Sequence, residues 1–138
     1  MLWKKKTPEK RTVLFVDDDE TVLKSLERGL LDESYNKLFA KSGEEALEIL
    51  GQEEVHVIIT DMRMYGMTGL ELLRTVREDY PHIIGMVLSG YDRDDALETA
   101  AVRGEIYRSI RKPWKIGEVD FEAAVRKAIE RYNLQNKH

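Results

Sequence analysis

Short apolar runs alternate along this chain with segments that repeat apolar residues every three or four positions. The runs are typical of strands covered on both faces, and the segments between them are typical of amphipathic helices. Strands are expected at residues 13–16, 37–40, 55–60, 83–88 and 106–110, and helices at 20–31, 43–51, 69–80, 92–104 and 118–134.

Five strand–helix units in succession predict an α/β fold with one parallel sheet and helices on both faces. We expect a doubly wound, five-stranded sheet of the flavodoxin-like order 2-1-3-4-5, joined by right-handed crossovers. The folded domain is expected to cover residues 12–134, after a polar lead-in at 1–11 and before a short tail at 135–138.

The composition limits which classes of partner the protein can be expected to bind and in which cellular compartment it can be expected to act. A chain of 138 residues fits one domain, and 22 basic against 26 acidic residues give a net charge of −4. That balance favours neither direct nucleic-acid binding nor an anionic membrane surface. The chain has no cysteine, which excludes disulfides and thiolate metal sites, and its apolar runs are too short to span a bilayer. We expect a cytoplasmic protein.

Residues with carboxylate, hydroxyl or ammonium groups follow four of the apolar runs. Three aspartates, Asp17–Asp19, follow the first run, and Asp61 follows the third. Ser89 follows the fourth run and Lys112 follows the fifth. Because ligands bind at the carboxyl ends of strands where the strand order reverses, we expect these side chains to meet at one edge of the sheet.

This combination suits phosphoryl chemistry, although each residue also has an ordinary interpretation. Asp17 and Asp18 can supply the carboxylates that Mg²⁺ prefers, whereas Asp19 suits a helix N-terminus. Asp61 is either a turn residue or a nucleophile that accepts a phosphoryl group as an acyl phosphate. Lys112 is either a surface lysine or the counter-charge of that group, and a lone serine such as Ser89 is most often a turn former.

Four motifs in this order resemble the receiver domain of the two-component response-regulator family. They are Val13–Glu20, Asp61–Gly69, Val87–Gly90 and Lys112–Trp114. The resemblance covers roughly residues 11–134 and implies a chemotaxis-regulator-like signalling domain. Such a domain is not an enzyme in the usual sense, because it promotes only its own phosphorylation and dephosphorylation.

The resemblance also implies a role for each site residue. Asp61 would be the phosphoacceptor, with Ser89 bonding the phosphoryl group and Lys112 pairing with it. Mg²⁺ would be held by Asp18 directly, by Asp17 largely through water, by Asp61, and by the backbone carbonyl of Arg63. The phosphodonor would be a sensor histidine kinase or a phosphotransfer protein.

Two positions depart from the family pattern. Tyr65 stands where a proline is usual, which predicts a less rigid loop, and Ser109 stands where an aromatic switch residue is usual. The family's signalling face, formed by the fourth helix, fifth strand and fifth helix, would receive an output domain outside this chain or a second copy in a homodimer.

Two other interpretations compete with a phosphorylated receiver. Asp17, Asp19 and Thr21 also form the DxDxT motif of haloacid-dehalogenase-type phosphatases, with Asp17 as nucleophile and Asp19 as general acid. The phosphatase interpretation does not explain Asp61, and the acidic pair that it would need soon after Lys112 is missing from the sequence. A receiver-like binding module that is never phosphorylated is the third possibility, and the missing switch aromatic favours it.

Overall fold

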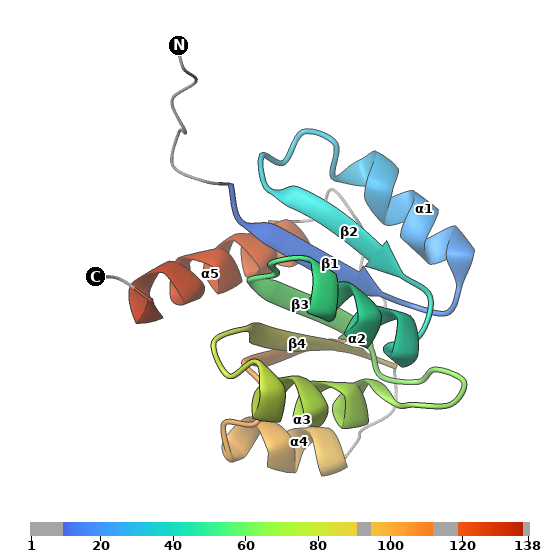
Figure 1. Ribbon diagram of the computed structural model, residues 1–138, viewed down its shortest axis with the longest axis vertical. Helices are drawn as coiled ribbons and strands as arrows, with labels where there is room; N and C mark the ends of the chain where they lie inside the picture. Colours follow the sequence, from blue (N-terminus) through green and yellow to red (C-terminus); the bar gives the residue numbers. More distant parts are fainter. Residues whose placement is uncertain (1–9, 91–94, 112–118, 137–138) are drawn as a thin grey trace.

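A five-stranded parallel sheet lies between two layers of helices in the computed structural model, which describes residues 10–90, 95–111 and 119–136 (Figure 1). The strand order is β2-β1-β3-β4-β5, as the sequence predicted. The strands are β1 (Thr12–Val16), β2 (Asn36–Ala40), β3 (Val57–Asp61), β4 (Ile84–Ser89) and β5 (Arg108–Arg111). The helices are α1 (Glu20–Gly29), α2 (Gly43–Gln52), α3 (Gly69–Asp79), α4 (Asp95–Val102) and α5 (Val119–Gln135).

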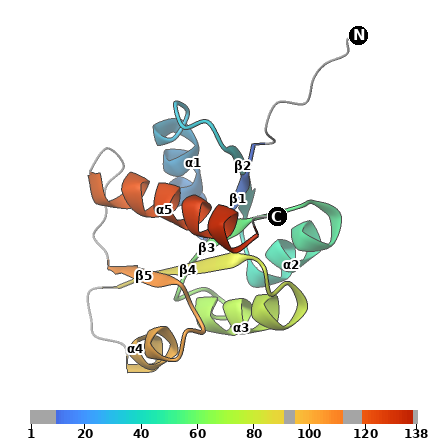
Figure 2. The same cartoon turned by 90° about the vertical axis from the view of Figure 1, so that its left-hand side faces the viewer.

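Two hydrophobic cores lie on the two faces of the sheet. Figure 2 shows α1 and α5 on one side of the strands and α2, α3 and α4 on the other. Successive residues of a strand point to opposite faces, so Phe15 and Ile59 pack with α1 and α5, whereas Leu14 and Ile58 pack with the other helices. This two-sided burial explains why the runs in β1 and β3 are apolar at every position.

The fifth strand is shifted from its expected position. Residues 106–110 were predicted as strand, but the ladder with β4 pairs Met86 with Arg108 and continues to Arg111. Ile106 belongs to the core beside α3 and α4, so its apolar character reflects packing before the strand begins. The other boundaries differ from expectation by at most two residues, except the start of the fourth helix: it was expected at residue 92, which lies outside the described residues, and α4 is described from Asp95.

A bidentate ion pair fastens α5 to the loop between α1 and β2. The Nε and Nη2 atoms of Arg126 donate to the two carboxylate oxygens of Glu33 at 3.0 and 2.6 Å. Hydrogen bonding from Arg126 lowers the pKa of the Glu33 carboxyl below its ordinary value of 4.5, although burial opposes this shift. The charged form of Glu33 is therefore favoured in the folded state.

Glu33→Gln is expected to change how stability depends on pH. A carboxyl with a lowered folded-state pKa stabilises the fold above the unfolded pKa, and this contribution is lost as pH falls through the folded pKa. Urea unfolding measured from pH 7 to pH 3 should give a lower free energy of unfolding for the variant at pH 7. Plotted against pH, the free energies of unfolding of the wild type and of Glu33→Gln should converge below pH 4.5. Glu48→Gln, on the exposed face of α2, serves as the control and should follow the wild-type pH profile.

Candidate metal centre

Three aspartate side chains converge at the carboxyl edge of the sheet. Asp17 and Asp18 directly follow β1, and Asp61 is the last residue of β3. One carboxylate oxygen from each lies within 4.8 Å of the others. Asp17 and Asp61 are buried and Asp18 is exposed, so the cluster has a closed side and an open side. The structure thus brings together three of the predicted site residues.

Asp17 is held in place by the backbone around it. Its N–H donates to the carbonyl of Ala40 at 3.1 Å, which extends the β1–β2 ladder by one residue. Its Oδ1 accepts the N–H of Asp19 at 2.9 Å. The carboxylate is therefore fixed in orientation at the base of the cluster.

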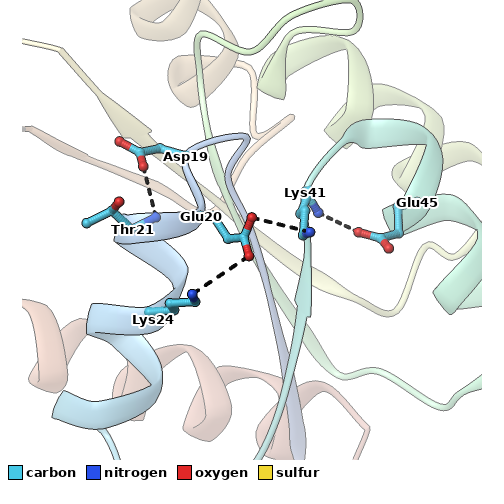
Figure 3. Close-up of polar contacts among 6 residues, drawn as sticks. All are labelled: Asp19, Glu20, Thr21, Lys24, Lys41 and Glu45. Atoms are coloured by element: carbon cyan, nitrogen blue, oxygen red, sulfur yellow. Dashed lines mark hydrogen bonds and ion pairs between the residues drawn. The ribbon is translucent and has the colours of Figure 1, made fainter.

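Asp19 has a structural role outside the cluster. It is the N-cap of α1, and its Oδ1 accepts the backbone N–H of Thr21 at 2.9 Å (Figure 3). This contact satisfies one of the N–H groups that a helix N-terminus leaves without a partner. The phosphatase interpretation needs Asp19 as a general acid beside Asp17, and the capping geometry gives that role no support.

The charge of Glu20 is compensated by two lysines. Its carboxylate lies 3.9 Å from Nζ of Lys24 and 3.4 Å from Nζ of Lys41 (Figure 3). Lys41 follows β2, so the pair links the start of α1 to the loop before α2. The fourth acid of the Asp17–Glu20 run therefore lies in its own ion pairs, outside the three-carboxylate cluster.

The N-terminus of α2 forms only part of the capping box that its sequence predicts. Ser42 to Glu45 predicts a capping box, in which serine and glutamate each bond the other's backbone N–H. Ser42 Oγ does accept the N–H of Glu45, at 3.0 Å. The glutamate carboxylate, however, accepts the N–H of Lys41 at 2.6 Å, one residue before the cap (Figure 3). Only half of the reciprocal box is present.

A complete capping box, missed in the sequence, lies at the start of α3. Thr68 Oγ1 accepts the N–H of Glu71 at 3.1 Å, and the Glu71 carboxylate accepts the N–H of Thr68 at 2.8 Å. The signal was available, because threonine followed three residues later by glutamate is the usual pattern. This cap fixes where α3 begins, directly beside Asp61.

Gly69 allows α3 to approach the backbone of Asp61. A Cβ atom added at Gly69 would overlap the carbonyl oxygen of Asp61 and would lie 3.0 Å from Cα of Met62. The N–H of Gly69 donates to the carbonyl of Met62 at 2.8 Å. The absence of a side chain at this position is therefore required by the packing around the acidic cluster.

Three other predicted site residues have a less complete description. Ser89 ends β4, is half-buried, and lies opposite Arg111 in the β4–β5 ladder; its Oγ donates a long, 3.5 Å hydrogen bond to the carbonyl of Ile110. Lys112 lies outside the described residues, so its place in the site remains a prediction. Arg63 is exposed in the β3–α3 loop, and its carbonyl as a metal ligand also remains a prediction.

The three carboxylates suit a divalent cation. Clustered negative charges repel one another, and a bound cation relieves that repulsion. Mg²⁺ prefers hard oxygen ligands and usually keeps several waters, which the exposed side of the cluster at Asp18 leaves room for. The donor set therefore fits Mg²⁺.

Comparison with known proteins identifies the family. Residues 13–126 match the response regulator receiver domain, and the chain belongs to that family. It is 38% identical over 128 residues to the hydrogenase transcriptional regulatory protein HoxA of Cupriavidus necator, an alignment that covers 92% of this chain and 26% of HoxA. It is 31% identical over 125 residues to the DNA-binding transcriptional regulator NtrC of Escherichia coli, covering 91% and 26% respectively. The chain thus spans about a quarter of the length of these relatives.

A solved structure agrees with this assignment. The signal receiver domain of an HD domain-containing protein from Pseudomonas fluorescens superimposes with a TM-score of 0.83 at 30% identity, covering 91% of this chain and 98% of that one. The predicted family and fold are therefore confirmed, and the comparisons support neither competing interpretation. No helix in the described residues is long and apolar enough to cross a membrane.

Proposed function

We propose that this chain accepts a phosphoryl group on Asp61 in a two-component system, with Mg²⁺ held by Asp17, Asp18 and Asp61. The observation that carries the proposal is the meeting of the three carboxylates within 4.8 Å. Bound Mg²⁺ would neutralise charge on the carboxylates and on the phosphoryl oxygens.

Asp61 is the best placed of the three to be the nucleophile. It ends the central strand β3, between β1, which leads to the acid pair, and β4, which ends at Ser89. Asp17 and Asp18 each accept a backbone N–H, from Asp19 and Tyr65, which suits acids that stay in one orientation. We assign those two to the metal and Asp61 to the phosphoryl group.

The proposed reaction is a transfer between two side chains. A carboxylate oxygen of Asp61 attacks phosphorus, the P–N bond of the donor's phosphohistidine breaks, and the imidazole leaves with its electron pair and takes a proton. The product is an acyl phosphate, which water later cleaves to restore the carboxylate and release inorganic phosphate. The hydroxyl of Ser89 and the ammonium of Lys112 would bond and pair with the transferred group.

The partners follow from the same proposal. A sensor histidine kinase or a phosphotransfer protein would supply the phosphoryl group. HoxA and NtrC are transcriptional regulators about four times as long as the aligned region, which supports an output domain outside this chain. We place the protein in the cytoplasm, where such a kinase would act, and keep a homodimer as a second mode of output.

The function is tested by incubating the protein with acetyl phosphate and Mg²⁺ and measuring its intact mass. We expect one added phosphoryl group, located on Asp61 after borohydride reduction and peptide mapping. A label on Asp17 would support the phosphatase interpretation instead. Failure to take up any phosphoryl group from either acetyl phosphate or a phosphohistidine donor would support the binding-module interpretation.

Mg²⁺ is expected to raise the melting temperature of the wild type. A ligand that binds only the folded state adds about 2.7 kcal/mol at one hundred times its dissociation constant. Thermal unfolding with increasing MgCl₂ should show this stabilisation, with KCl at equal ionic strength as the control. Asp18→Asn should lose most of the effect. Equal responses of the two proteins to Mg²⁺ would argue against Asp18 as a ligand.

A further inference from the structure

One hydrogen bond connects the loop after Asp61 to the acidic cluster. The backbone N–H of Tyr65 donates to Oδ2 of Asp18 at 2.9 Å, across 47 residues of sequence. Asp18 is the exposed member of the cluster, so packing restrains its side chain less than it restrains Asp17 or Asp61. The contact with Tyr65 is therefore well suited to set the orientation of this carboxylate.

The donor in this contact is a feature of this chain. The receiver family usually has a proline at the position of Tyr65, and proline has no backbone N–H to donate. Tyr65 is 92% exposed as a residue, so its side chain adds little to the packing of the loop. What the tyrosine provides and a proline would not is the N–H group that reaches Asp18.

A carboxylate can serve the N–H and a cation together. Its two oxygens offer about four lone-pair sites, so one oxygen can accept the N–H while a metal uses remaining capacity. Groups that hydrogen-bond a metal ligand fix its orientation, and their loss typically lowers metal affinity by about 10- to 100-fold. A contact of this kind orients the ligand before the ion arrives.

We propose that the backbone N–H of Tyr65 is a positioning group for the metal centre. It holds the Asp18 carboxylate so that an oxygen faces the position shared with Asp17 and Asp61. This inference rests on the proposed function, since it requires Asp18 to bind the cation. The side chain of Tyr65 has no part in it.

Two variants of one residue separate the N–H from the side chain. Tyr65→Pro removes the donor, whereas Tyr65→Ala removes the exposed ring and keeps the donor. Isothermal titration with Mg²⁺ should give equal affinities for wild type and Tyr65→Ala. It should give a dissociation constant about tenfold higher for Tyr65→Pro. Circular dichroism of the metal-free proteins checks that all three are folded.

A second measurement needs no metal and no proline. Amide hydrogen exchange at Tyr65 should be slow in the wild type and faster in Asp18→Ala, because the acceptor is lost. The exchange of Leu72, within α3, should be the same in both proteins. This comparison tests the contact directly even if Tyr65→Pro folds poorly.

The outcomes distinguish this inference from the function on which it rests. A wild type that does not bind Mg²⁺ refutes the proposed metal centre, and the positioning role with it. A wild type that binds Mg²⁺, together with an equal or higher affinity in folded Tyr65→Pro, refutes the positioning role alone. Unchanged exchange of the Tyr65 amide in Asp18→Ala refutes it as well.

Discussion

Asp61→Asn is expected to abolish phosphorylation by acetyl phosphate and to leave the fold intact. Asparagine has nearly the same shape but lacks the anionic oxygen that attacks phosphorus. The substitution also removes one of three negative charges that lie within 4.8 Å of one another. Relief of that repulsion should raise the metal-free stability by roughly 1 kcal/mol. Intact mass and thermal unfolding of the same sample measure the two effects.

Asp17→Asn is the matched control for this substitution. It changes the charge of the cluster equally and leaves Asp61 in place, so phosphorylation should become slower and need more Mg²⁺ without disappearing. If Asp61→Asn still acquires a phosphoryl group and Asp17→Asn does not, the nucleophile has been assigned to the wrong aspartate.

Gly69→Ala is expected to be among the most damaging single substitutions in the chain. The new Cβ would overlap the carbonyl oxygen of Asp61, and a backbone atom cannot move aside as a flexible side chain can. Such overpacking should cost about 3 kcal/mol of unfolding free energy. The rate of phosphorylation should also fall, because relief of the overlap displaces Asp61 or the start of α3. Urea unfolding and phosphorylation kinetics test both consequences.

Gly51→Ala makes the same chemical change where there is room for it. Gly51 lies in the last turn of α2, and an added Cβ would meet nothing within 4 Å. Alanine has the higher helix propensity, so this variant should be as stable as the wild type or more stable by up to about 1 kcal/mol. A Gly69→Ala variant that unfolds at the same urea concentration as Gly51→Ala would contradict the packing argument.

The sequence predicts this fold well because periodicity and topology agree. Strands that are apolar at nearly every position require cover on both faces, and strand–helix alternation supplies it. The convergence of Asp17 and Asp61 follows from the same reasoning, because parallel strands end at one edge. Prediction was weaker at β5, where Ile106 is apolar for packing and the strand itself contains two arginines and a serine.

Apart from the capping box at Thr68 and Glu71, the contacts of the site that sequence reasoning missed depend on backbone atoms. The N–H of Tyr65 and the carbonyl of Asp61 have no side-chain signature, so their contacts with Asp18 and with Gly69 appear only in three dimensions. Asp19 shows a different difficulty: its side chain is visible in the sequence, but the sequence alone does not distinguish its role from those of the two adjacent aspartates. The structure separates them, because Asp19 caps α1 while its neighbours join the cluster.

The central position of β3 affects which parts of the molecule can respond to a new charge. This strand is hydrogen-bonded to β1 on one side and to β4 on the other, whereas β5 is a four-residue edge strand with exposed side chains at Arg108 and Ser109. Core strands open only in near-global unfolding, and edges open locally at much lower free energy. Asp61 therefore lies on a strand that is expected to open at high free energy, and we expect any displacement that follows a change of charge at Asp61 to occur nearer the edges of the sheet.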